Sequence, residues 1–181
     1  MKAFILAAGR GERLLPLSLL RPKTLFPVAN RPVIHYAIEF LKGHGIQEFI
    51  VNLHHLPHQV RENLGDGREL GVVSHYSPEF PEILGTAGGI KQAEDLLQDE
   101  TFVVMNGDLL VKFDLPQALS YHRGRRALAT LVLREDLEAP EGRDIVLDGE
   151  GRVLRFLTHG ETRTPPSREA MFTGVDRKSV V

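Results

Sequence analysis

The sequence predicts an α/β protein in which helices cover both faces of a mixed, mostly parallel sheet, a three-layer α/β/α arrangement of the Rossmann-like type. Short runs of apolar and β-branched residues alternate along the chain with segments whose apolar residues have helical spacing. Several of these runs are apolar at consecutive positions, which is typical of strands buried on both faces. A chain of 181 residues, 42% of them hydrophobic, is long enough for one packed domain and too short for two to be expected.

The expected elements follow in order. Strands are predicted at residues 2–7, 48–52, 72–76, 101–105 and 127–133, and helices at residues 32–42, 57–64, 89–97 and 115–122. Pro32 in the first turn and Gly43 just past the end delimit the first helix, and Gly65 stops the second. After residue 133 the pattern changes to short runs at 145–147, 153–157 and 171–175, which indicate a smaller antiparallel or mixed addition at the sheet edge.

Composition excludes several classes of function. A formal net charge of −2 gives no basic surface for nucleic acid, so no nucleic-acid partner is expected. The absence of cysteine excludes disulfides and thiol catalysis. No apolar run approaches the ~20 residues that span a bilayer, and the apolar residues 3–8 are interpreted as a buried first strand rather than a signal peptide. We therefore expect a cytoplasmic protein with no membrane partner.

The last six residues, 176–181, differ from the rest. They are polar and then abruptly apolar, without a turn signal that closes an element. GAT-CGG-AAG-AGC-GTC-GTG, a match to a common sequencing adapter, encodes these six residues. We expect residues 176–181 to be a non-native tail and exclude them from the fold prediction.

The first candidate site is the glycine-rich loop Leu6-Ala-Ala-Gly-Arg-Gly-Glu-Arg-Leu14 after the first predicted strand. Gly9 and Gly11 allow a sharp turn and close approach to a ligand, and successive N–H groups in such a loop can bind an anion. Leu14 stands where the dinucleotide fingerprint has its third glycine, and no Gly-Lys-Ser/Thr follows. The loop is therefore neither a dinucleotide fingerprint nor a P-loop, which excludes a dinucleotide-dependent oxidoreductase.

Two cations follow the glycines. Arg13 lies at the base of the loop, and Lys23 follows Pro22 in a segment rich in proline and leucine. A guanidinium can bind phosphate oxygens in a bidentate manner, and an ammonium adds a compact second positive charge. Together they indicate a phosphate site.

The segment Leu84-Gly-Thr-Ala-Gly-Gly-Ile90 opens the third predicted helix. Small residues with free N–H groups at a helix start allow a planar base or an anion to approach the backbone. The alternative is an ordinary helix N-terminus with Thr86 as its cap.

The segment Val104-Met-Asn-Gly-Asp108 places an acid just past the carboxyl end of a buried strand, where ligands bind in open α/β sheets. A carboxylate there can hold Mg²⁺ and leave most of its coordination shell to water and phosphates. The alternative is a turn, since Asn-Gly-Asp is favourable turn sequence.

The segment from Leu6 to Pro32 resembles the signature of the nucleotidyl transferase family, and the Leu-Gly-Thr-Ala-Gly and Asn-Gly-Asp segments follow in the family's order. Its members join a sugar 1-phosphate to a nucleoside triphosphate and release pyrophosphate. The resemblance implies the nucleotide-diphospho-sugar transferase fold, Mg²⁺ as cofactor, and a nucleoside triphosphate and a sugar 1-phosphate as partners; a homo-oligomer is compatible with it. Residues 1–175 are expected to form the catalytic domain, incomplete at its carboxyl terminus, because the family's second metal-binding aspartate would lie further on.

The resemblance also implies residue roles. The expected catalytic cations are Arg13 and Lys23, and the expected Mg²⁺ ligand is Asp108. The expected nucleotide-binding residues are Leu6, Ala7, Ala8, Gly9, Gly11, Gly85, Thr86 and Gly88, and the expected sugar-binding residues are Asn106, Gly142 and Gly174. Most members carry threonine at the position of Glu12, which we expect to face away from the triphosphate because its charge would be repelled. Residues 157–161 depart from the Glu-Lys pair whose lysine contacts the sugar phosphate in the family.

The expected reaction is nucleotidyl transfer to a sugar 1-phosphate. The Gly-Glu-Arg and Gly-Thr-Ala-Gly-Gly variants resemble mannose-1-phosphate guanylyltransferases and the uridylyltransferase that acts on N-acetylmuramate 1-phosphate, with GTP and mannose 1-phosphate as the preferred pair. A non-catalytic regulatory subunit that binds a nucleotide sugar is the alternative. His54, His55 and His58 have partial zinc-site spacing, but the sequence lacks the accompanying Glu and cysteines, and a plain loop is expected there.

Overall fold

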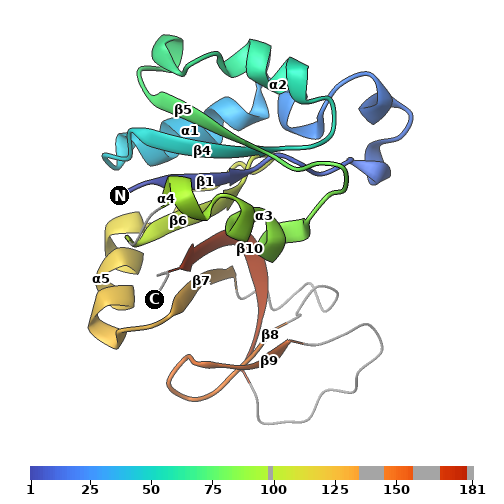
Figure 1. Cartoon of the computed structure of the whole chain (residues 1–181). Coiled ribbons are helices and arrows are strands. Elements are labelled where there is room, and N and C mark those ends of the chain that lie inside the picture. Colours follow the sequence, from blue (N-terminus) through green and yellow to red (C-terminus); the bar gives the residue numbers. More distant parts are fainter. Residues whose placement is uncertain (98–99, 135–144, 157–167, 179–181) are drawn as a thin grey trace. The chain divides into compact units, whose positions relative to one another are not determined.

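The computed structural model describes residues 1–97, 100–134, 145–156 and 168–178 (Figure 1). The chain divides into two compact units, one of Met1–Thr130 with Asp176–Val181 and one of Leu131–Val175. Gly142 and residues 157–161, which carried expectations about the sugar, lie outside the described residues.

The first unit contains a parallel sheet. Its strands have the order β5-β4-β1-β6, and their bounds are β1 Ala3–Leu6, β4 Glu48–Leu53, β5 Val73–Pro78 and β6 Phe102–Asn106. All three pairings are parallel, and Phe4 of β1 lies opposite Ile50 of β4 and Val104 of β6. The predicted parallel α/β arrangement is confirmed. Because β1 and β4 have neighbours on both sides, their carboxyl ends lie in the middle of one sheet edge, where ligands bind in open sheets.

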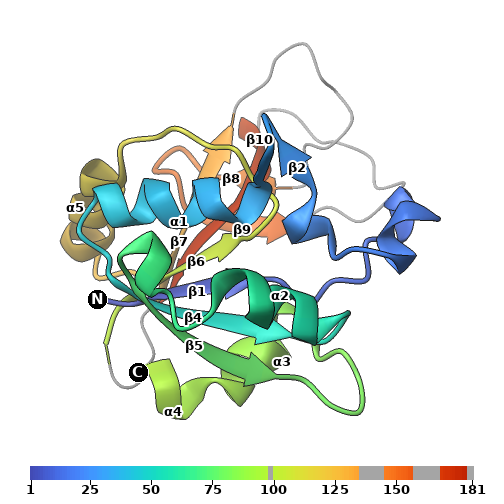
Figure 2. The ribbon, with the colours of Figure 1, turned by 90° about the horizontal axis from the view of Figure 1, so that it is seen from above.

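Helices cover both faces of this sheet, as the consecutive apolar residues predicted. α1 (Val33–Gly43) lies on one face, and α3 (Gly85–Gln92) and α4 (Glu94–Leu97) lie on the other (Figures 1 and 2). The core under α3 and α4 joins residues of this helical segment to residues of β1, β4 and β6, namely Phe4, Ile50, Ile90, Ala93, Leu97, Phe102 and Val104. The opposite face takes the apolar stripe of α1, whose Ile34, Ile38 and Leu41 are fully buried.

Two further helices complete the first unit. α2 (Pro57–Leu64) lies beside α1, where His35 and Asn63 are joined at 2.8 Å. α5 (Leu115–Arg125) begins after Asp114, whose side chain accepts from the N–H of Gln117 as a helix cap. Between β1 and α1, three single-turn 3-10 helices, Glu12–Leu14, Leu17–Leu19 and Lys23–Leu25, precede a hairpin of β2 (Pro27–Val28) and β3 (Arg31–Pro32).

The predicted third helix differs from expectation in its bounds. It begins at Gly85 rather than Gly89, and it is divided at Ala93, whose N–H bonds to the carbonyls of both Gly89 and Ile90. The sequence signal failed at the start of this helix because its first turn consists of small residues without an apolar stripe.

The two strand pairings described around β8 in the second unit are antiparallel, in agreement with the antiparallel strands predicted after residue 133. β8 (Ile145–Leu147) pairs with β9 (Val153–Phe156) on one side and with β10 (Arg168–Lys178) on the other. Ile145 and Leu147 form a small core with Leu131 and Leu133 of β7 (Ala129–Arg134). Among the described residues of the whole chain, no helix has the length and apolarity to span a membrane.

Candidate active site

The glycine-rich loop leaves β1 at the carboxyl edge of the sheet and packs tightly against the segment that follows it. Gly11 has φ of 66°, which favours glycine, and a Cβ there would lie 3.2 Å from Cβ of Ser18. A Cβ on Gly9 would lie 3.2 Å from Cε of Lys23. The two glycines therefore allow the loop and Lys23 to approach each other closely.

A charged hollow of about 770 Å³ opens beside this loop. Its lining residues come from four separate segments and are Arg10, Gly11, Glu12, Arg13, Leu14, Lys23, Ile83 and Asp108. Nζ of Lys23 lies 2.9 Å from Oδ2 of Asp108, with side chains 26% and 30% exposed. The structure thus brings together the two predicted cations and the predicted metal ligand. Glu12, which is expected to face away from the triphosphate, is exposed and is also among the residues that line the hollow.

A second hollow of about 180 Å³ adjoins the first, because Lys23 and Ile83 line both. Its other lining residues are mostly small or uncharged and are Leu6, Ala8, Gly9, Asn52, Glu79, Gly85, Thr86 and Asn106. It brings the loop after β1 next to the start of α3, as the predicted nucleotide site requires. Ala7 and Gly88 line neither hollow, and Gly174 lies in β10, mostly within the second unit.

Asp108 reaches the charged hollow because β6 ends against the loop of its neighbour. The N–H of Gly107 donates to the carbonyl of Leu6 at 3.0 Å and extends the contact between β1 and β6. A Cβ on Gly107 would lie 3.0 Å from Cγ2 of Thr24 and 3.1 Å from Cγ2 of Ile5. Glycine at this position therefore keeps Asp108 close to the segment that carries Lys23.

Sequence reasoning missed two buried polar residues that line the second hollow. Asn52, 2% exposed, and Glu79, fully buried, are joined by a hydrogen bond of 2.7 Å from Nδ2 of Asn52 to Oε1 of Glu79. Oδ1 of Asn52 accepts from the N–H groups of Ala7 at 2.6 Å and Ala8 at 3.3 Å. The available signal was an amide inside the apolar run of β4, since a buried polar side chain needs partners.

The buried pair also corrects the alternative interpretation of Thr86 as a helix cap. The cap position is Leu84, and its N–H donates to Oε2 of Glu79 at 2.8 Å, while Thr86 lies inside the first turn of α3. The carboxylate of Glu79 therefore caps the start of this helix in place of the Thr86 side chain. Thr86 is exposed and lines the second hollow.

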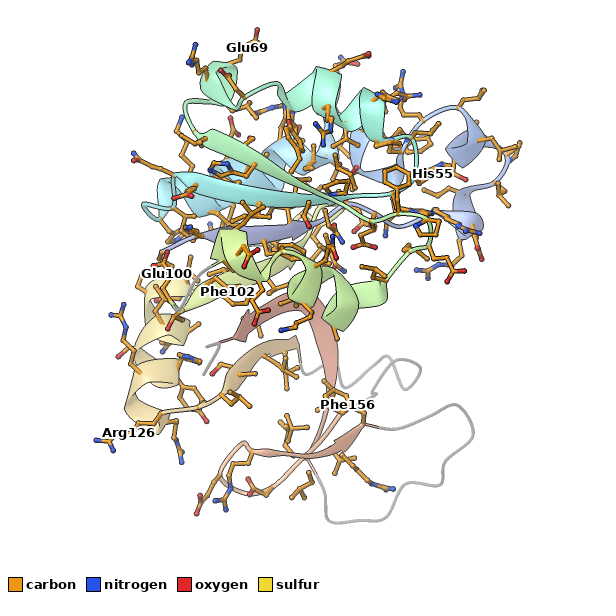
Figure 3. All side chains as sticks on the ribbon, in the orientation of Figure 1. His55, Glu69, Glu100, Phe102, Arg126 and Phe156 are labelled. Atoms are coloured by element: carbon orange, nitrogen blue, oxygen red, sulfur yellow. The ribbon has the colours of Figure 1, made fainter. Side chains whose placement is uncertain are left out.

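His54 and His55, which follow β4, contact backbone carbonyl groups of other segments. Nδ1 of His54 lies 2.9 Å from the carbonyl oxygen of Glu79, and Nε2 of His55 lies 2.6 Å from that of Ser18. Figure 3 shows His55 at the end of β4, directed toward the segment after the glycine-rich loop. Within the described ranges, no three His, Cys, Asp or Glu side chains gather in a way that could hold a metal ion.

The nucleotidyl transferase family model matches residues 2–159. The chain is 34% identical over 189 residues to UTP–glucose-1-phosphate uridylyltransferase of Synechocystis, a match that covers 97% of this chain and 47% of the relative. It is 48% identical over 118 residues to N-acetylmuramate α-1-phosphate uridylyltransferase of Neisseria meningitidis, covering 65% of this chain and 51% of the relative. It is 35% identical over 166 residues to mannose-1-phosphate guanylyltransferase of Mycobacterium tuberculosis, covering 91% of this chain and 45% of the relative.

The chain thus spans about half the length of these curated relatives. Among solved structures, HddC from Yersinia pseudotuberculosis, complexed with GMP-PN, superposes with a TM-score of 0.82 at 21% identity. That superposition covers 98% of this chain and 76% of HddC, and it supports the fold. With the family model matched across both hollows and the parallel sheet, the chain belongs to the nucleotidyl transferase family.

Proposed function

We propose that the two hollows bind a nucleoside triphosphate and that the protein transfers its nucleotidyl group to a sugar 1-phosphate, releasing pyrophosphate. The observation that carries this proposal is the meeting of Arg13, Lys23 and Asp108 around one hollow that adjoins a smaller, largely uncharged one. The charged hollow suits the phosphates of the nucleotide. The small residues of the second hollow allow the nucleobase to come close to the protein backbone. A module that only binds nucleotide sugars has less need for all three charged groups.

The proposed step is an in-line displacement. An oxygen of the sugar 1-phosphate attacks the α-phosphorus, a new P–O bond forms, and the bond to the β-phosphate oxygen breaks, so that pyrophosphate leaves. Arg13 and the N–H groups of the loop stabilise the negative charge that grows on the phosphate oxygens. Lys23 positions the attacking phosphate or the α-phosphate. Such a reaction depends on positioning and electrostatics and needs no covalent nucleophile from the protein.

The residues of the charged hollow fit Mg²⁺. This ion keeps several waters and is usually held by one or two carboxylates together with substrate phosphates, rather than by a cage of protein ligands. Asp108 supplies a carboxylate that is 30% exposed at the hollow and is already paired with a cation there. When bound, Mg²⁺ would neutralise phosphate charge, and Asp108 is the described residue that would hold it.

Two substrate pairs are proposed. GTP with mannose 1-phosphate is the first, supported by the guanylyltransferase relative that matches 91% of this chain. UTP with N-acetylmuramate 1-phosphate is the second, supported by the uridylyltransferase relative with 48% identity over a shorter stretch.

The test is a panel of pyrophosphate-release assays on the full-length gene product. Four nucleoside triphosphates are combined with glucose, mannose and N-acetylmuramate 1-phosphates in the presence of Mg²⁺. Release that requires one triphosphate and one sugar phosphate together supports the proposal and names the pair. Tight nucleotide binding without any release in the panel would instead support the regulatory alternative.

A further inference from the structure

Asn52 is a buried amide whose two ends face two different loops. It lies near the end of β4, in the middle of the sheet, with 2% of its surface exposed. Its oxygen accepts from the N–H groups of Ala7 and Ala8 in the glycine-rich loop, at 2.6 Å and 3.3 Å. Its nitrogen donates to Glu79 at 2.7 Å. The side chain therefore has a fixed orientation, because each end has a partner of the opposite kind.

Glu79 extends this connection to the start of α3. Its second carboxylate oxygen accepts from the N–H of Leu84 at 2.8 Å, directly before the first helical residue. A Cβ on Gly89 would clash with Oε1 of Glu79 and would lie 3.0 Å from Nδ2 of Asn52, so α3 packs directly against the pair. A continuous chain of hydrogen bonds thus runs from Ala7 and Ala8 through Asn52 and Glu79 to Leu84.

We infer that Asn52 is a positioning residue, which acts through Glu79 to set the distance between the glycine-rich loop and the start of α3. This inference rests on the proposed function, because those two segments line the hollow assigned to the nucleotide. Loss of the bond between them would leave the buried amide nitrogen of Asn52 and one buried carboxylate oxygen of Glu79 without that partner. Because an unpaired buried polar group costs more free energy than a hydrogen bond gains, the pair favours a single geometry. The glycine-rich loop and the start of α3 are thus held in place by the buried side chains of Asn52 and Glu79.

The two polar ends can be exchanged, which provides the test. In Asn52→Asp two carboxylates would face each other at the position of the 2.7 Å bond, and in Glu79→Gln the new amide would present a donor to either Asn52 or Leu84. In the double variant that combines Asn52→Asp with Glu79→Gln, the carboxylate at position 52 accepts from the N–H groups of Ala7 and Ala8. The amide at position 79 donates its N–H to that carboxylate, and its oxygen accepts from the N–H of Leu84. All four hydrogen bonds and the net charge are then conserved.

The experiment measures the dissociation constants of the four Mg²⁺-triphosphates for the full-length gene product and for its three variants, together with amide exchange of Ala7, Ala8 and Leu84 in ligand-free protein. We expect each single variant to bind about tenfold more weakly or worse, because fewer molecules hold the binding geometry. The same three amides should exchange faster in the single variants. The double variant should recover both properties to within about threefold.

Three outcomes overturn the inference: single variants that bind and exchange like the wild type, a double variant no better than the single ones, or a double variant that recovers exchange but not binding. The last result would mean that Glu79 acts by touching the nucleotide. If the single variants do not fold, a folded and binding double variant supports the inference, and a double variant that also fails overturns it. A wild type that binds no triphosphate refutes the proposed function, while the exchange data still decide the coupling between the loops.

Discussion

Nζ of Lys23 lies 2.9 Å from Oδ2 of Asp108 in the charged hollow, although the two residues belong to distant parts of the chain. The pair joins a residue proposed to bind phosphate to a residue proposed to bind Mg²⁺. Before the substrates bind, this ion pair keeps both side chains at the hollow. In the proposed reaction Lys23 then binds a phosphate in place of Asp108, and Asp108 binds Mg²⁺ in place of Lys23.

Lys23→Ala should lower turnover by ~10²-fold or more, because a preorganised charge next to the reacting phosphates is lost. Its effect on stability should stay below about 1 kcal/mol, because partly exposed ion pairs contribute little. Pyrophosphate release and urea unfolding measure the two effects. Lys91→Ala, which removes a 75% exposed ion-pairing lysine of α3, is the control and should leave turnover unchanged. A Lys23→Ala enzyme with wild-type turnover would contradict the role of this residue.

Asp108→Asn should raise the Mg²⁺ concentration needed for half-maximal turnover by at least about tenfold, since the amide lacks the charge that a hard cation prefers. Chelation of the metal with EDTA should abolish turnover in the wild type and excess Mg²⁺ should restore it. The measurement is a Mg²⁺ titration of pyrophosphate release. An Asp108→Asn titration curve that overlies the wild-type curve would remove this residue from the proposed metal site.

Gly11→Ala should destabilise the chain by about 1–2 kcal/mol, because an L-residue at φ of 66° is strained. The new Cβ would also lie 3.2 Å from Cβ of Ser18, so nucleotide affinity should fall as the loop shifts. Gly124→Ala in α5, where a Cβ meets nothing within 4 Å, is the matched control and should be neutral or stabilising by up to ~1 kcal/mol. Equal effects of the two substitutions on urea unfolding would show that the loop is not constrained.

The β2–β3 hairpin supplies a pH prediction away from the site. Arg31 donates to both carboxylate oxygens of Glu39 on α1, and this hydrogen bonding holds the pKa of Glu39 below its ordinary value. Because the pKa is depressed in the folded state, the stability that the pair contributes is present above the unfolded pKa, about 4.3, and is lost as pH falls through the folded pKa. NMR titration of Glu39 should show the depressed value, and Arg31→Gln should return it to the ordinary range; an unchanged value in that variant would contradict the assigned cause.

Strong local patterns made much of the fold predictable. The apolar runs at residues 48–52 and 101–105 became β4 and β6 with shifts of one residue at most, and the helix predicted at residues 57–64 is α2. Pro57 at the start and Gly65 at the end bound that helix by the usual steric rules. The hairpin of β2 and β3 was missed because its two-residue strands are too short for any periodic signal.

The charged residues of the candidate site were predictable from the sequence, whereas the buried residues that position the loops around it were not. Arg13, Lys23 and Asp108 each stand in a recognisable motif, and the structure brings all three to one hollow. Asn52 and Glu79 stand in no motif, and their roles depend on a pairing across 27 positions. This contact depends on how β4 pairs with β5 in the folded sheet, so the spacing of the two residues along the sequence does not reveal it. The residues expected to bind the sugar include Gly142, which lies outside the described ranges, and their roles remain predictions.

The assignment of the charged hollow to the triphosphate is tested most directly by Arg13→Ala in the pyrophosphate-release assay, with Arg68→Ala as control. Arg13 lines the hollow, whereas Arg68 is 89% exposed in a 3-10 helix and lines neither hollow. We predict that Arg13→Ala lowers turnover by ~10²-fold or more and that Arg68→Ala leaves it unchanged. Turnover of Arg13→Ala equal to that of Arg68→Ala would contradict the assignment of this hollow to the phosphates.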